Sequence, residues 1–313
     1  MSEPVVLQGL HATSLLGYLA ALGTLVALAE ERSSTPRLAW HRQGGQWTAV
    51  VRDLPEGVHR EALPERLADR LKTLESSSAV LFAKDLSVSG AQFREQAWQA
   101  AGSATLWDRA DADFMAAFGC DAIIDKKSGQ IRDTSFRTMS GAGNQHFLES
   151  MKKLAGLTTA ADLTHALFEE WAYTDEQPSM RWDARDDRRY ALRWRNPSGD
   201  PPRTVRGANR LAIEALRLLP TAPVGKGIAT TGFRRESTGN HFTWPVWDSP
   251  LSVDAVRSVL GLSQLEVTKR GHMSELQARG VVELYRSTRR TVGKYVIFTP
   301  AVPATLQVGA PSP

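Results

Sequence analysis

Cysteine is almost absent from this sequence. Cys120 has no second thiol with which to pair, so an internal disulfide framework and a cysteine-based zinc site are excluded. A lone thiol of this kind is typical of a buried residue in a reducing cytoplasm. The seven histidines are scattered, and none forms a two-histidine helix motif. The sequence therefore predicts a cytoplasmic protein that holds no cofactor and no metal.

Long apolar runs are also lacking. The stretch from Leu15 to Ala29 is too short to span a bilayer and is interrupted by Gly17 and Gly23. It follows no lysine or arginine of the kind that opens a signal peptide. We predict a core helix here, with Thr13 or Ser14 as its N-cap, and no contact with a membrane.

The excess of positive charge is small. The 313 residues include 38 lysines and arginines and 34 acids, which gives a formal net charge of +4 and a pI near 9.3. A strongly positive surface must therefore come from local segregation of charge. At 42% hydrophobic residues the chain can bury a real core and divide into two or three domains. These numbers favour a dedicated binding face.

The spacing of apolar residues predicts an α+β fold. A strand is expected at 5–10, and a hairpin at 38–43 and 46–52 would turn at Gly44-Gly45. Helices are expected at 61–75, 93–101, 110–118 and 209–219. We expect an N-terminal region at 1–105 with a small antiparallel sheet and helices, a helical and arginine-rich region at 106–250, and a C-terminal winged-helix-like module at 251–313.

The order of elements near the C-terminus suggests the winged helix. Helices at 253–260 and 273–278 precede β-rich runs at 281–285 and 295–299, and the turn between those runs is basic. The wing of such a module commonly contacts a nucleic-acid backbone, although element order alone does not establish that function. The alternative is a hairpin that docks on a partner protein. The basic residues of this turn are Arg286, Arg289, Arg290 and Lys294.

Arginine is concentrated between positions 181 and 210. Nine arginines lie there among four aspartates and three aromatic residues, Trp182, Tyr190 and Trp194. A guanidinium holds phosphate oxygens bidentately, and an aromatic ring can stack on an unpaired base. The alternative is a set of solvated faces and internal ion pairs, with Trp182 and Trp194 in the core. The arginines of this segment predicted to bind nucleic acid are Arg185, Arg188, Arg189, Arg193, Arg195, Arg203, Arg206 and Arg210.

Two glycine-containing loops are further candidates. Glycines at 141 and 143 precede a helix start, where backbone N–H groups can receive a phosphate, but the lysine and the spacing of a P-loop are missing. Asn144, Gln145 and His146 could read base edges from this loop, or Asn144 could be a helix cap. Arg234 and Arg235 follow a second loop, at 225–232, for which a β-turn region is the favoured interpretation.

Signals of catalysis are weak. Asp121, Asp125 and Lys126 superficially match the acids and lysine of metal-dependent nucleases, but no clear strand carries the second acid and the lysine. A second carboxylate cluster, at Asp183, Asp186 and Asp187, is outnumbered by arginines that would repel a divalent metal. We therefore predict no catalytic residues.

Short segments spread over most of the chain resemble a known family. They are 7–10 (Leu-Gln-Gly-Leu), 15–23 (Leu-Leu-Gly-Tyr-Leu-Ala-Ala-Leu-Gly), 143–148 (Gly-Asn-Gln-His-Phe-Leu), 182–190, 206–209 (Arg-Gly-Ala-Asn) and 293–295 (Gly-Lys-Tyr). Together they resemble the CRISPR-associated large subunits of the type I-G class, formerly type I-U. The resemblance implies a non-catalytic subunit of a crRNA-guided surveillance complex. Such a subunit would contact target DNA and other complex subunits, with a role in recognising the adjacent motif or recruiting a helicase-nuclease.

The sequence thus favours a nucleic-acid-binding subunit with DNA, crRNA and other complex subunits as partners. A metal-dependent nuclease is the first alternative, and it would require a divalent ion. A protein-protein adaptor, whose basic faces meet acidic partner surfaces, is the second.

Overall fold

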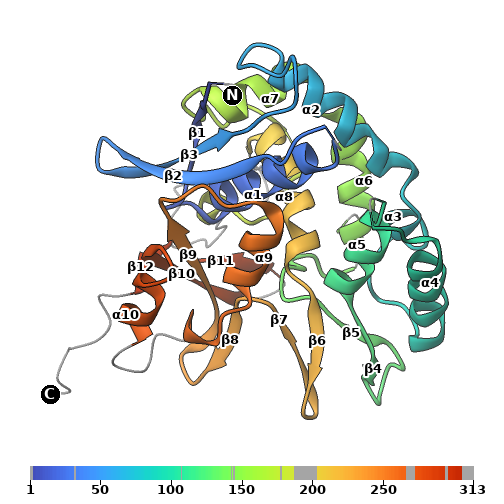
Figure 1. Ribbon diagram of the computed structural model, residues 1–313. Helices are drawn as coiled ribbons and strands as arrows, with labels where there is room; N and C mark the ends of the chain where they lie inside the picture. The colour runs from blue at the N-terminus through green and yellow to red at the C-terminus, as the bar shows by residue number, and fades with distance from the viewer. Residues whose placement is uncertain are drawn as a thin grey trace, which may run out of the picture.

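The computed structural model describes residues 3–31, 33–106, 108–141, 143, 145–176, 178–186, 203–265, 272–292 and 295–304. Helices and strands are mixed along the chain, which confirms the α+β prediction (Figure 1). The helices are α1 (Leu15–Ala29), α2 (Leu63–Leu71), α3 (Ser78–Leu81), α4 (Gly90–Ser103), α5 (Ala110–Phe118), α6 (Phe147–Leu157), α7 (Ala160–Phe168), α8 (Arg206–Ala215), α9 (Val253–Leu260) and α10 (His272–Gln277). Short 3-10 segments are η1 (Lys72–Ser76), η2 (Ala184–Asp186), η5 (Leu216–Leu218) and η6 (Ser263–Leu265).

The strands form small antiparallel sheets. β1 (Val5–His11), β2 (Arg37–Gln43) and β3 (Gln46–Arg52) make one sheet in the order β1-β3-β2. The predicted hairpin is confirmed, because Gly44 and Gly45 both adopt positive φ at its turn. The remaining strands are β4 (Gly119–Ile124), β5 (Ile131–Asp133), β6 (Thr221–Val224), β7 (Gly227–Thr230), β8 (Phe233–Glu236), β9 (Gly239–Trp247), β10 (Val281–Val292), β11 (Tyr295–Phe298) and β12 (Val302–Pro303).

Helix α1 is the centre of the core. The Ser14 side chain caps it by accepting a hydrogen bond from the Gly17 N–H, and nearly every residue of the helix is buried. Helix α8 packs against it so closely that a Cβ added to Gly23 would lie 1.7 Å from the carbonyl oxygen of Leu211. The glycine that interrupts the apolar run is therefore a contact point between two helices. Among the described residues no helix is long and apolar enough to cross a membrane.

Tryptophans join the N-terminal sheet to the C-terminal one. Trp40 of β2 stacks on Tyr18 of α1, with ring centroids 5.5 Å apart. The indole N–H of Trp244 donates to the carbonyl oxygen of Ala12, and that of Trp247 donates to the carbonyl oxygen of Leu38. Buried tryptophans that also satisfy their polar atoms fix the relative placement of the two sheets.

The winged-helix prediction is not confirmed. β10 pairs along most of its length with β9, in a sheet of order β11-β10-β9-β8 to which β12 is added through β10. This sheet joins residues on both sides of the boundary predicted at 250/251. The basic run that was expected to form a turn after Tyr285 is instead strand up to Val292. The strand was missed because its polar side chains hide the two-residue period that marks a half-buried strand.

Candidate nucleic-acid interface

Trp182, in the arginine-rich segment, belongs to the core. The indole of Trp182 is fully buried, packs edge-on against Phe136, and donates its N–H to the carbonyl oxygen of that residue at 2.9 Å. The prediction that Trp182 stacks on a base is therefore wrong, and the core alternative is correct for this residue. Arg188, Arg189, Tyr190, Arg193, Trp194 and Arg195 lie outside the described residues.

The prediction that Arg210 binds phosphate is also wrong. Its side chain is completely buried on α8, where Nη1 lies 2.8 Å from Oε1 of Glu214 and Nη2 donates to the carbonyl oxygen of Leu71 at 2.6 Å. A carboxylate four residues later on the same helix face holds the guanidinium in place. The reason for the error is that α8 is buried on nearly all sides, which an arginine-rich sequence does not reveal.

The other described arginines of this segment differ in exposure. Arg206 is mostly buried and pairs with Asp162 at 3.2 Å, as the internal ion-pair alternative expected. Arg203 is exposed and donates to the carbonyl oxygen of Thr174. Arg185 is exposed and lies over the ring of Tyr173 at 4.2 Å. Arg185 and Arg203 thus remain candidates for a phosphate contact.

The predicted basic wing has only one exposed cation among its described residues. Arg286 is buried, with Nε donating to Oγ1 of Thr243 at 3.1 Å and Nη1 donating to Oε2 of Glu236 at 3.4 Å, so it is not the exposed cation that the predicted wing required. Arg289 is half-buried and donates to a backbone carbonyl, and burial lowers the pKa of its guanidinium. Arg290 is exposed, and Lys294 lies outside the described residues.

The glycine loop at 141–146 does not present an open helix start. The backbone N–H of Phe147, the first residue of α6, donates to Oδ1 of Asp85 at 3.0 Å, so a carboxylate already occupies this position. Gln145 was predicted to read a base, but its Oε1 already accepts a hydrogen bond from Nη1 of Arg181 at 3.4 Å. His146 is the N-cap residue of α6 and its side chain makes no capping hydrogen bond. Asn144 lies outside the described residues.

The carboxylates considered for a metal are engaged locally. Oδ1 of Asp125 accepts from the backbone N–H groups of Lys127 and Ser128, and Asp121 pairs with Arg94 at 2.5 Å. Asp183 accepts from the hydroxyl of Tyr173. No group of three or more histidine, cysteine or acidic residues able to hold a metal occurs within the described residues. Cys120, expected to be buried, is only half-buried on β4.

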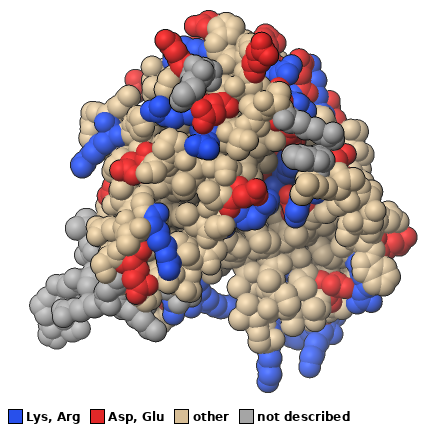
Figure 2. Space-filling view, in the orientation of Figure 1, with Lys and Arg blue, Asp and Glu red and all other residues tan. Residues whose placement is uncertain are grey.

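Exposed cations gather instead on a row of neighbouring strands, which we call the hairpin face. The β4–β5 hairpin lies against the β6–β7 hairpin, β7 contacts β8, and β8 continues through β9 to β10. The tips of the first two hairpins point to the lower edge in Figure 1, and lysine and arginine side chains project from that edge in Figure 2. The exposed cations of the hairpin face are Lys126, Lys127, Arg132, Lys226, Arg235 and Arg290.

Most acids of these strands have a cationic partner or a local hydrogen bond. Asp121 pairs with Arg94, whereas in the described part of the chain Asp125 of the β4–β5 turn and Glu283 of β10 accept hydrogen bonds from uncharged donors only. Asp133 pairs with Arg137, and Glu236 pairs with the buried Arg286. None of the six exposed cations, by contrast, forms an ion pair with any residue that the structure describes. Six cations against two acids without an ion pair among the described residues leave an excess of positive charge on this face.

Sequence reasoning missed the lysines at the tips of these hairpins as binding residues. Lys126 was weighed only as a nuclease residue, and Lys226, between Gly225 and Gly227, only as part of a flexible loop. Gly225 and Gly129 both adopt positive φ, so each marks a tight turn. A lysine next to such a turn between two β-rich runs is the signal that could have located them.

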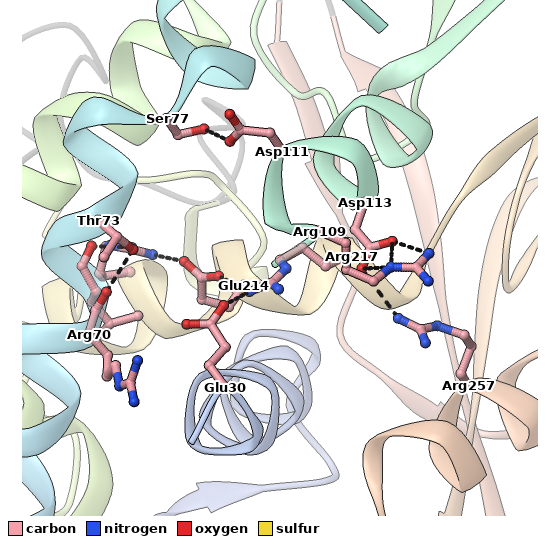
Figure 3. Close-up of polar contacts among 12 residues, drawn as sticks. Glu30, Arg70, Thr73, Ser77, Arg109, Asp111, Asp113, Glu214, Arg217 and Arg257 are labelled. Atoms are coloured by element: carbon pink, nitrogen blue, oxygen red, sulfur yellow. Dashed lines mark hydrogen bonds and ion pairs between the residues drawn. The ribbon is translucent and has the colours of Figure 1, made fainter. Parts of the chain in front are cut away.

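A cavity of about 690 Å³ lies elsewhere, lined by residues of α2, η1, α4, α5, α8 and η5 and by Glu30 at the end of α1. Figure 3 shows the polar contacts at its wall: Nη1 of Arg217 reaches Glu30 at 2.5 Å and Glu214 at 3.2 Å, and Arg109 pairs with Asp113. Burial alone would raise the pKa of Glu214, but the nearby guanidiniums outweigh it and hold that pKa below its ordinary value. We interpret these charges as a structural network, because each is matched by a neighbour.

Comparison of the chain with protein-family models and with curated proteins gives no match.

Proposed function

We propose that this protein binds nucleic acid along the hairpin face, by contacts to the phosphate backbone. The observation that carries the proposal is the imbalance of charge there. Six exposed cations form no ion pair with a described residue, whereas three of the five acids of these strands and their turns, Asp121, Asp133 and Glu236, have cationic partners. Phosphate contacts of this kind position a protein on nucleic acid and supply much of its affinity.

The positions of the lysines support this function. Lys126 and Lys127 occupy one hairpin tip and Lys226 another. A β-hairpin is narrow, so the ammonium groups at its tip can reach the groove of a duplex or the backbone of a single strand. An ammonium on a flexible stem is a point charge that tolerates variation in the position of a phosphate. We expect the affinity to depend little on base sequence.

We further propose that this binding serves a crRNA-guided surveillance complex of type I-G, in which the chain would be a non-catalytic subunit. The support is the set of short segments that resemble large subunits of that class. Target DNA, crRNA and the other subunits would be its partners. A role in recognising the adjacent motif or in recruiting a helicase-nuclease belongs to the same proposal.

The test is binding of fluorescently labelled single-stranded DNA, duplex DNA and crRNA-like RNA to the full chain. The variant K126Q/K127Q/K226Q removes the three tip charges, and it keeps the backbone N–H of residue 127 that donates to Asp125. The matched control, K72Q/K152Q/K153Q, removes three exposed lysines from η1 and α6.

We expect the tip variant to lose more than about tenfold in affinity at low salt for every ligand, because each lost phosphate contact contributes to binding regardless of sequence. The control should bind as the wild type does. Equal losses in both variants would show a general effect of net charge and would contradict the proposed site. Retained binding in the tip variant would contradict it as well, and capture of only acidic proteins would favour the adaptor.

A further inference from the structure

A second cavity, of about 320 Å³, opens beside the hairpin face. It lies where the bases of β6 and β7 meet β8, β9, β10 and the segment after α9. Its volume falls in the range of small-ligand sites. The residues that line it are Pro220, Ala222, Ala229, Thr230, Thr231, Gly232, Phe233, Arg234, Thr243, Leu260, Gly261, Leu262, Ser263, Leu265 and Arg286.

The charged residues of this lining are both arginines, Arg234 and Arg286, and no acid lines the cavity within the described residues. Arg286 is nine-tenths buried, and its Nε and Nη1 are held by Thr243 and Glu236. Its Nη2 makes no hydrogen bond to any residue in the described part of the chain. A buried guanidinium with a donor left over in a cavity without acids is suited to an anionic group.

The rest of the wall combines apolar side chains with three threonines and a serine. The ring of Phe233 packs edge-on against Phe136, with centroids 4.9 Å apart, and remains half-exposed. Leu260 and Leu265, both buried, also line the cavity. Oγ1 of Thr230 is engaged with Oγ1 of Thr221 and with the backbone N–H of Ser135, so it is held in place. A flat, largely apolar group in this cavity therefore has an aromatic ring and leucine side chains to pack against.

We propose that this cavity holds one unpaired nucleotide, with its phosphate at Arg234 and Arg286 and its base beside Phe233. The inference rests on the proposed function, since the hairpin face would guide the strand to the cavity. Lys226 stands at the tip of the hairpin whose base lines the cavity, and the exposed Arg235 follows Arg234 directly in β8. A nucleic-acid strand fits both the row of exposed cations and the cavity, because it has a phosphate at every nucleotide and a base that can enter the cavity.

A consequence is a preference for unpaired strands. In a duplex the base is stacked and paired, and taking it out of the stack costs free energy that a single strand does not require. Stacking of a base on an aromatic side chain can change affinity by about tenfold or more. We expect a single strand to bind about tenfold more tightly than a blunt duplex of the same sequence.

The experiment uses the full chain and two serine variants. S263W places a large ring at the rim of the cavity, where Ser263 is exposed. S258W is the matched control, because Ser258 is exposed on α9 and does not line the cavity. R234Q is a second test that removes a charge without adding bulk. Titration calorimetry with AMP measures the cavity alone, and labelled single-stranded and duplex DNA measure the hairpin face together with the cavity.

We expect wild type and S258W to bind AMP, and S263W and R234Q to bind it at least tenfold more weakly. S263W should also lose the preference for single strands while it keeps its affinity for the duplex. AMP binding that is absent in the wild type, or unchanged in both S263W and R234Q, would overturn the inference. Absence of DNA binding in a protein that still takes AMP would overturn the proposed function and leave the cavity as a site for free nucleotides.

Discussion

Arg210 and Glu214 form an ion pair one turn apart on α8, with both side chains buried and Nη1 2.8 Å from Oε1. Arg217 extends this pair to Glu30 of α1, so that a charged network lies between two helices of the core (Figure 3). Arg210 and Arg217 therefore stabilise the fold and are not available to bind a ligand.

The first prediction concerns this buried network. Glu214→Gln should lower the free energy of unfolding by about 3 to 5 kcal/mol, because it leaves the guanidinium of Arg210 buried without its carboxylate. The double variant R210M/E214L removes both charges and should be markedly more stable than Glu214→Gln. Urea denaturation of the two proteins gives the comparison. If Glu214→Gln were as stable as the wild type, the Arg210–Glu214 ion pair would not stabilise the protein, which would contradict this prediction.

The second prediction concerns the contact between α1 and α8. Gly23→Ala should destabilise the protein by about 1 to 3 kcal/mol or more, because the new Cβ would overlap the carbonyl oxygen of Leu211. Gly102→Ala on α4 is the matched control, since nothing lies within 4 Å of a Cβ there. That control should be stabilised by about 0.5 to 1 kcal/mol. Thermal unfolding of both variants tests the contact, and similar melting temperatures would contradict it.

The third prediction separates two arginines of β10. Arg290→Gln should weaken nucleic-acid binding and leave the melting temperature nearly unchanged, because Arg290 is exposed and has no ion pair with a described residue. Arg286→Gln should remove a phosphate contact of the cavity and should also lower the free energy of unfolding by about 1 to 3 kcal/mol, because Glu236 and Thr243 lose a charged partner. A loss of stability in Arg290→Gln, with unchanged stability in Arg286→Gln, would contradict this prediction.

The fourth prediction concerns pH. Burial, with Arg286 nearby, lowers the pKa of His241 below 6.5 in the folded protein. The unfolded chain therefore binds a proton more readily, so the free energy of unfolding should fall as the pH drops through about 6.5 toward the folded pKa. His11 contributes in the same direction, because burial lowers its pKa too.

His241→Gln isolates the contribution of one imidazole. In urea titrations between pH 7.5 and 5, which span about one pH unit on either side of the ordinary histidine pKa, this variant should lose stability less steeply than the wild type. Equal slopes for wild type and His241→Gln would contradict the assignment.

Local signals predicted much of the N-terminal fold. The Ser14 cap, the apolar run of α1 and the pair Gly44-Gly45 each act within a few residues of the structure that they specify, and all three elements form as expected. The length of β10 was not predictable in the same way. Two consecutive polar residues of this strand, Arg286 and Ser287, are both buried although their side chains point to opposite faces, and only the pairing with β9 makes them part of a strand.

The candidate site was less predictable than the fold. Arg210 and Arg290 look alike in sequence, yet one is in the core and the other on the surface. What separates them is long-range packing, which decides whether an acid or solvent faces the guanidinium. The grouping of Lys126 with Lys226 depends in the same way on the contact between two hairpins that are distant along the chain.

The dependence of duplex binding on salt is the most direct measurement of the hairpin face. Each phosphate neutralised contributes about −0.9 to the slope of log K against log salt concentration, so several contacts should give a slope of about −3 to −5 for the wild type. K126Q/K127Q/K226Q should reduce that slope by about 2 to 3, and K72Q/K152Q/K153Q should leave it unchanged. A flat dependence in the wild type, or the same slope in the tip variant, would contradict phosphate binding by this face.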